Sequence, residues 1–262
     1  MVRLIFLSLL LLPFVSYSQV NIESMRASKK GFLTTLSLGS QFKRGNNNVF
    51  DLSSSLRLDH NTQSNHFFIM GGYDYGQSND SDYKDAKFAH VRNTYMFYDD
   101  LGVLVDRYES FLGVEGFTQY QSDRFSDLKL RQLLGFGLRY EERDESTVKI
   151  PISDVLAFGV GGMVEYESLI SERGEGFVFR LTNYASIRNI VADHSSYSFI
   201  AYYQPKVSDF RDFRILSELG FNYRFHKNTY ITNAFKFNYD SRPPKGVEKY
   251  DLTNIVSLKL DW

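Results

Sequence analysis

The sequence predicts an all-β protein: one antiparallel transmembrane β-barrel of about twelve strands, within a range of about ten to fourteen. Three observations predict this fold class. The C-terminal residues alternate between apolar and polar side chains for about a dozen positions, and a strand needs only about 9–11 residues to cross a bilayer. The N-terminal residues have the pattern of a secretory signal. Between these ends, turn-rich breaks separate further alternating runs.

The composition argues against a helical membrane protein. The 262 residues are 43% hydrophobic with a mean hydropathy of −0.31, and no segment after the leader approaches the roughly 18 consecutive apolar residues of a membrane helix. A barrel fits these values, because lipid-facing apolar residues alternate with polar residues that face the lumen. Aromatic residues make up 16% of the chain, as expected for girdles at two membrane interfaces.

Cysteine content and charge exclude several other classes of function. The chain has no cysteine, which excludes disulfides, thiolate metal sites, a cysteine nucleophile and a lipid-modified cysteine. The formal net charge is −1, so the chain lacks the basic surface of a nucleic-acid-binding protein. No cofactor and no metal site are expected.

Residues 1–18 read as a Sec signal peptide. Arg3 gives the positive start, an apolar run extends from Leu4 to Val15, and Ser16 and Ser18 frame a small-x-small cleavage site. A membrane anchor is the alternative, but the apolar run is short for one. Residues 19–30 form a polar lead-in, and the barrel is expected over residues 31–262. These features predict the outer membrane of a Gram-negative bacterium, and the Ser-Gln cleavage site resembles those of Bacteroidota.

Alternating runs define which face of each strand looks inward. In three of the clearest runs, 50–59, 134–141 and 213–225, mostly apolar residues occupy every second position, and the charged residues of each run all fall at the positions between them. Arg or Lys at the bilayer midplane costs roughly 2–4 kcal/mol, so the charged face is expected to face the lumen. A register shift of one residue would point these charged side chains into the lipid.

Breaks between the runs set the strand count. They lie at residues 43–48, 61–64, 76–84, 99–102, 121–127, 142–153, 171–176, 189–193, 205–212, 226–228 and 241–247. About eleven breaks imply about twelve strands, and an even number places both termini at one end of the barrel, expected to be periplasmic.

The closing strand predicts partners. Its lipid-facing side carries the aromatic C-terminus and a row of apolar residues, a pattern that the barrel-assembly machinery reads during insertion: Tyr250, Leu252, Val256, Leu258, Leu260 and Trp262. The expected partners are therefore this machinery and the lipid of the outer membrane, with small polar solutes as the cargo.

The inward charges form a candidate lumen charge ladder. Its members are Arg57, Glu115, Arg131, Arg139, Glu141, Arg180, Arg214, Glu218, Arg224, Lys236 and Lys259. They either select small charged solutes in a narrow pore or neutralise one another in a packed polar core. The inward glycines Gly135, Gly137, Gly159 and Gly161 indicate either open space or room for a bulky neighbouring side chain.

A lipid-modifying barrel enzyme is the sharpest alternative. His194, Ser195 and Ser196 form the tight His/Ser cluster of the chain, but adjacent residues of a strand point to opposite faces, and the cluster lies at a predicted periplasmic turn. We therefore predict no catalytic residues and no enzymatic activity.

Two segments resemble a known family. The strand and Gly-Asn turn from Gly31 to Asn46, and the final hairpin around Tyr239-Asp240-Ser241-Arg242-Pro243-Pro244-Lys245-Gly246, resemble the salt-induced outer membrane proteins, a family of bacterial barrels without an assigned role. The resemblance implies an outer-membrane barrel and supplies no catalytic residues. The predicted function is a narrow passive channel for small solutes or ions, with a non-conducting envelope scaffold as the alternative.

Overall fold

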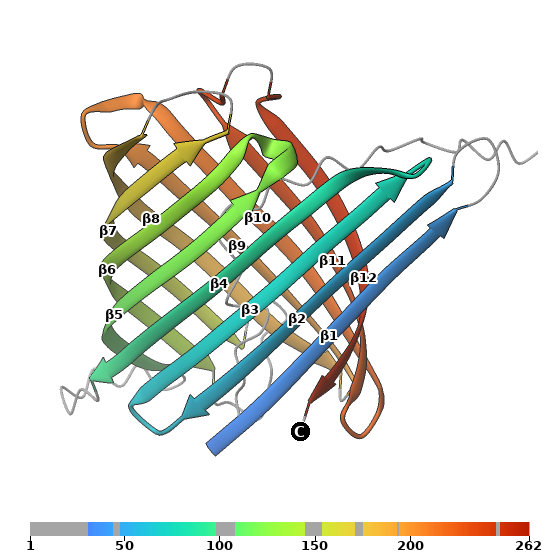
Figure 1. Ribbon diagram of the computed structural model, residues 1–262. Coiled ribbons are helices and arrows are strands. Elements are labelled where there is room, and N and C mark those ends of the chain that lie inside the picture. Colours follow the sequence, from blue (N-terminus) through green and yellow to red (C-terminus); the bar gives the residue numbers. More distant parts are fainter. Residues whose placement is uncertain are drawn as a thin grey trace, which may run out of the picture.

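The computed structural model describes residues 31–43, 48–97, 108–144, 154–170, 175–192, 194–244 and 247–261, which form a closed antiparallel barrel (Figure 1). Its strands, within those residues, are β1 (Gly31–Lys43), β2 (Val49–Asn61), β3 (Asn65–Ser78), β4 (Ser81–Phe97), β5 (Tyr108–Asp123), β6 (Leu128–Asp144), β7 (Val155–Leu169), β8 (Glu175–Ala192), β9 (Ser195–Lys206), β10 (Asp209–His226), β11 (Thr229–Asp240) and β12 (Tyr250–Asp261). The predicted twelve-stranded barrel is confirmed.

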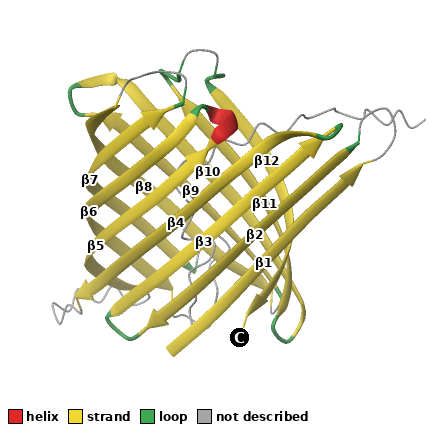
Figure 2. Ribbon diagram, in the orientation of Figure 1, coloured by secondary structure: helices red, strands yellow, loops and turns green. Residues whose placement is uncertain are grey.

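Each strand pairs with its neighbours in the chain, and β1 closes the ring by pairing with β12. One turn of 3-10 helix, η1 (Arg124–Ser126), lies between β5 and β6 (Figure 2). No helix among the described residues is long and apolar enough to span a membrane. The predicted signal peptide, the lead-in and Trp262 lie outside the described residues.

The predicted breaks fall between successive strands, but several strands run further than the turn residues indicated. The break at 76–84 is mostly strand, because β3 ends at Ser78 and β4 begins at Ser81. Asn79 and Asp80 have positive φ angles of 49° and 64°. This is the backbone of a two-residue hairpin turn whose twist matches the strands, and Asn and Asp tolerate it better than most side chains.

The exterior of the barrel is apolar and the interior is polar. On β6, Leu134 and Phe136 are 66% and 61% exposed, whereas Arg139 is fully buried. On β12, Leu252 and Val256 face outward and Thr253 faces inward. This arrangement is the reverse of a soluble protein and matches the alternation of a transmembrane barrel.

Placing a charge on the outer face of β12 should therefore destabilise the barrel in lipid. We expect Val256→Arg to lower the free energy of unfolding in lipid vesicles by about 2–4 kcal/mol, since the guanidinium would lie in hydrocarbon. Ile255→Arg is the matched control, because Ile255 lines an interior cavity. Urea unfolding followed by the heat-dependent gel shift measures both, and an equal cost for the two variants would contradict the assignment of faces.

Candidate functional site

The barrel interior has a packed side and an open side. The packed side is formed by inward side chains of β4 to β9, where bulky and charged groups fill the space. The open side is formed by β10 to β12 and β1 to β3, where many inward residues are serine, glycine or alanine. The distribution of side-chain volume therefore leaves space against one wall of the barrel.

On the packed side, aromatic rings pack directly over glycines, in the space that a side chain would otherwise fill; we call each such position a glycine seat. A Cβ on Gly159 would lie 2.0 Å from Cε1 of Tyr184, and a Cβ on Gly135 would lie 2.2 Å from Cζ of Phe117. Each aromatic residue is the register partner of its glycine on the adjacent strand. These glycines thus admit a bulky neighbour, one of the two roles that the sequence left open.

Gly137 and Gly161 do not border open space either. A Cβ on Gly161 would lie 2.5 Å from the carbonyl oxygen of Phe136, and one on Gly137 would lie 2.8 Å from that of Val160. The two residues are register partners, so β6 and β7 approach closely there. The expectation of open space at the inward glycines of these strands is corrected: the space lies at the opposite wall.

A buried polar network crosses the packed side. Arg139 lies 2.7 Å from Glu141 and donates from Nη1 to the hydroxyl oxygen of Tyr184 at 2.8 Å. That hydroxyl donates to Oε2 of Glu115 at 3.0 Å, and Glu115 also pairs with Arg92 at 3.3 Å. The contacts join β4, β5, β6 and β8, so they tie distant parts of the wall together through the lumen.

A second network lies nearer the end opposite Gly31 and Asp261. Arg214 pairs with three carboxylates, Glu165 at 2.7 Å, Asp240 at 2.9 Å and Glu167 at 3.1 Å. Glu167 also forms an ion pair with Arg131 at 2.6 Å. Because every guanidinium in the network has a carboxylate within reach, the desolvation of these charges is offset by pairing.

Cations and aromatic rings fill the remaining packed volume. The guanidinium of Arg57 lies 3.8 Å from the centroid of the Phe68 ring, and Phe68 stacks on His90 at 5.5 Å. His90 stacks on Phe117 at 6.0 Å, and Arg92 lies 4.6 Å from the same phenyl ring. This column runs across the inner faces of β2 to β5, so the packing extends from the packed side onto part of β2 and β3.

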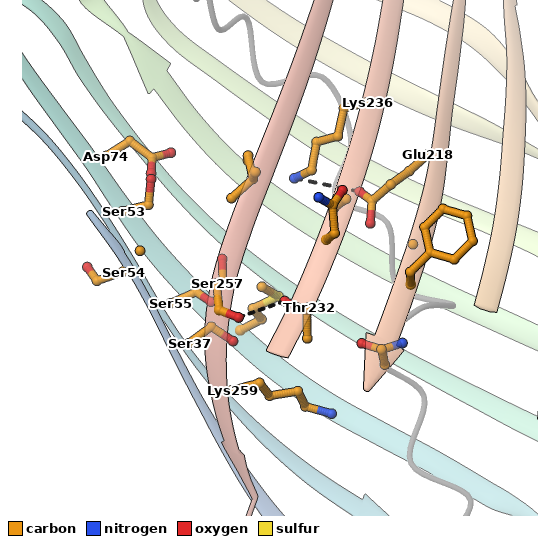
Figure 3. Close-up of a pocket in the computed structure, with 18 of the residues that line it drawn as sticks. Ser37, Ser53, Ser54, Ser55, Asp74, Glu218, Thr232, Lys236, Ser257 and Lys259 are labelled. Atoms are coloured by element: carbon orange, nitrogen blue, oxygen red, sulfur yellow. Dashed lines mark hydrogen bonds and ion pairs between the residues drawn. The ribbon is translucent and has the colours of Figure 1, made fainter. Parts of the chain in front are cut away.

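The open side holds a cavity of about 120 Å³, which we call the main cavity (Figure 3). Small residues create the space: Ser37, Gly39, Ser53, Ser55, Gly220, Ala234 and Ser257. Three members of the charge ladder line it, Glu218, Lys236 and Lys259, and Nζ of Lys236 lies 3.6 Å from Oε2 of Glu218. A smaller cavity of about 60 Å³ lies toward the end of the barrel opposite Gly31 and Asp261, bordered by Arg131, Arg214 and Asp240.

The structure thus separates the predicted ladder into groups. Glu218, Lys236 and Lys259 border the main cavity, and Arg131 and Arg214 border the smaller one. The remaining members are buried among other interior side chains or, for Arg224, contact a turn: Arg57, Glu115, Arg139, Glu141, Arg180 and Arg224. Arg139 faces inward as expected and is fully buried among the interior side chains; its role as a selectivity residue stays a prediction.

Sequence reasoning missed the buried Asp74 and the serines that line the main cavity. A signal for the serines was available, since Ser53 and Ser55 alternate with Leu52 and Leu56 on a strand whose apolar face was assigned to lipid. Small inward residues on such a strand predict local space. Asp74 sits between glycines and tyrosines and gave no comparable signal.

Two further predicted groups are placed by the structure. His194 lies at the turn between β8 and β9, where its Nδ1 is 3.3 Å from Nη2 of Arg224, and the neighbouring Ser196 hydroxyl is 3.5 Å from the Asn222 amide. On β12, Tyr250, Leu252, Val256 and Leu258 are 62%, 52%, 57% and 44% exposed, as a lipid-facing row requires, and Leu260 is partly exposed.

Comparisons with known proteins give one family and several distant structures. The family model described as "Protein of unknown function, DUF481" matches residues 36–262. The translocator domain of the autotransporter NalP from Neisseria meningitidis is 10% identical, with 92% of this chain and 91% of that chain covered and a TM-score of 0.41. The NanC porin is 13% identical (87% and 97% covered, TM-score 0.40). The KdgM porin in complex with disordered oligogalacturonate is 9% identical (87% and 96% covered, TM-score 0.38). Among curated proteins, no sequence matches the chain.

Proposed function

The chain belongs to the family described as "Protein of unknown function, DUF481". Because this description gives no function, we propose one from the structure of the barrel interior: a narrow passive channel for small polar solutes or ions. The observation that carries this proposal is the main cavity, which lies off the barrel axis beside the small inward residues of β10 to β12, β1 and β2. The charged side chains that fill the packed side confine any passage to this wall.

The apolar exterior supports placement in a membrane. Outward residues such as Leu134, Phe179 and Val256 are more than half exposed, a cost in water that hydrocarbon removes. Together with the predicted Sec signal peptide, this favours the outer membrane of a Gram-negative bacterium, with both termini periplasmic. The Bacteroidota-like cleavage site and the resemblance to the salt-induced proteins belong to the same proposal.

The lining of the main cavity favours small solutes with weak charge selectivity. Lys236 and Lys259 line the cavity together with Glu218 and Asp74, so two cations are matched by two carboxylates. Serine hydroxyls supply both donors and acceptors to a passing solute. A narrow passage with balanced charges admits ions of either sign, and selectivity would then depend on the residue nearest the constriction.

A non-conducting scaffold is the second candidate, and the two buried networks favour it. Arg214 and Tyr184 link strands across the lumen and stiffen the barrel, which suits a structural role as well as a pore. We propose no catalytic role for His194 and Ser195. A catalytic pair would require the imidazole to hydrogen-bond to the serine hydroxyl. The imidazole of His194 lies beside Arg224 instead.

Single-channel recording in planar bilayers distinguishes the two candidates. We expect Ala234→Trp to reduce conductance by about fivefold or more, because an indole ring would occupy the main cavity and a narrow pore conducts through the space that is left. Phe235→Trp is the matched control, since Phe235 is the neighbouring outward residue and its replacement leaves the cavity unchanged. Silence of the unmodified protein across salts and voltages would favour the scaffold.

Charge variants test the route through the open side. Lys259→Glu should shift ion selectivity toward cations, whereas Arg139→Ala should leave selectivity unchanged because its side chain is buried in the packed network. A shift with Arg139→Ala and none with Lys259→Glu would place the conducting route on the other side of the barrel.

A further inference from the structure

The closure of the ring is much shorter than its other strand pairings. β1 and β12 share four register pairs, from Thr35 with Asp261 to Leu38 with Leu258. On the other side of each strand the pairing is extensive, with thirteen register pairs between β1 and β2 and eleven between β11 and β12. The described register across this junction, which we call the seam, ends at Leu38 and Leu258, whereas β1 continues to Lys43 and β12 begins at Tyr250.

The main cavity lies directly behind the seam. Its lining comes from both sides, with Ser37, Gly39 and Ser53 on β1 and β2 and with Ile255 and Ser257 on β12. In Figure 3, Ser37 and Ser55 lie beside Ser257 across the junction of these strands. A Cβ on Gly39 would be 3.5 Å from both Oγ of Ser257 and the carbonyl oxygen of Val256, so the two strands are still close where the pairing ends.

The membrane-facing surface next to the seam has polar positions among apolar residues such as Leu252 and Val256. Nδ2 of Asn254 donates to Oδ1 of Asn233 at 2.7 Å, with Asn254 exposed on the outside of β12. On the other side, Ser40 is exposed on β1. Unpaired backbone groups facing hydrocarbon are costly, because lipid tails offer no hydrogen-bond partner. Polar groups on both sides reduce this cost and would hydrogen-bond to a polar head group that passes between the strands.

We propose that the seam is a lateral portal through which a small membrane-dissolved amphiphile exchanges between the bilayer and the main cavity. The polar head would lie among the serine hydroxyls and the ammonium groups of Lys236 and Lys259, and the acyl tail would lie between β1 and β12. This inference rests on the proposed placement of the barrel in a membrane. It gives the cavity a second route, perpendicular to the barrel axis and independent of ion conduction.

Quenching of tryptophan by brominated lipid tests the portal. The chain has one tryptophan, so Trp262→Phe provides a background in which a single indole is introduced. Ile255→Trp reports on the cavity wall beside the seam. Tyr202→Trp reports on a buried inward position of β9, which pairs with strands on both sides. Leu252→Trp, on the outside of β12, reports whether the barrel is inserted at all.

In vesicles of phosphatidylcholine with brominated acyl chains, we expect the indole of Ile255→Trp to be quenched at least about twice as strongly as that of Tyr202→Trp, since a closed wall excludes acyl chains. Strong quenching of Leu252→Trp with equal, weak quenching of the two inward positions would overturn the portal alone. Absence of quenching at Leu252→Trp would instead overturn the membrane placement on which the proposed function depends.

A crosslink across the seam tests the route. Continuing the register beyond Leu38 and Leu258 brings Ser40 opposite Val256, and the chain has no cysteine of its own. Oxidation of Ser40→Cys/Val256→Cys should lower the quenching of Ile255→Trp to that of Tyr202→Trp while single-channel conductance is retained, and reduction should restore it. Leu219→Cys/Phe235→Cys, a register pair of β10 and β11, is the control. Quenching that persists in the crosslinked seam variant would overturn the portal.

Discussion

Replacing Arg214 with methionine is expected to lower the free energy of unfolding by about 3–5 kcal/mol, because it leaves buried carboxylates without their cation. Arg214 is buried and lies within 3.1 Å of Glu165, Glu167 and Asp240, which come from β7 and β11. Arg131 and Arg180 can each offset one of these charges in part, but no other cation of the described strands reaches all three. Urea unfolding in detergent, followed by the loss of the heat-dependent gel shift, measures the effect.

The same strand provides the control. Arg211 on β10 pairs with Asp209 at 3.2 Å, but its side chain is 86% exposed. Surface ion pairs contribute only about 0–1 kcal/mol, so Arg211→Met should leave the unfolding midpoint nearly unchanged. If the two methionine variants unfolded alike, the interior network would not be a determinant of stability.

Replacing Gly159 with valine is expected to cost about 3–5 kcal/mol, from overpacking and from the loss of charge-assisted hydrogen bonds. The added Cβ would lie 2.0 Å from the Tyr184 ring, which must then leave its seat on β7. When the ring moves, the hydroxyl loses Arg139 and Glu115 together, so the network across the lumen is broken at its centre. The same urea titration reports this loss.

Gly162 is the matched control on the same strand, because a Cβ there meets nothing closer than 4.0 Å. Gly162→Val should be nearly neutral. Adding Tyr184→Ala to Gly159→Val removes the clash, and the double variant should then be less destabilised than the sum of the two single variants. Additive costs would mean that the ring does not occupy the glycine seat.

The fold followed from the sequence because its determinants are local. The face on which a strand residue lies depends on its position in that strand, so alternation assigns Arg57, Arg139 and Arg214 to the interior without knowledge of other strands. Turn residues mark strand ends for the same reason. The boundary errors fall where polar residues such as Asn79 and Asp80 make a two-residue turn and the strands continue through the remaining polar positions.

The site could not be predicted to the same degree, because it depends on where along the barrel axis the inward side chains of different strands meet. Tyr184 on β8 and Glu115 on β5 are 69 residues apart, and their contact depends on the register of every intervening strand pair. Alternation alone cannot tell a charge that lines a cavity, such as Lys259, from one sealed in a network, such as Arg139. Glycines opposite aromatic partners were ambiguous for the same reason.

The position of the ring closure also determines what a shortened chain would become. The four register pairs between β1 and β12 involve the residues from Leu258 to Asp261. A product ending at Ser257 would lose all four pairs at once and remain an open sheet with two free edges, the type of surface that pairs with other chains and aggregates. Closure of the sheet therefore depends on four consecutive residues of β12, and deletion of these residues is expected to be an all-or-none defect in folding.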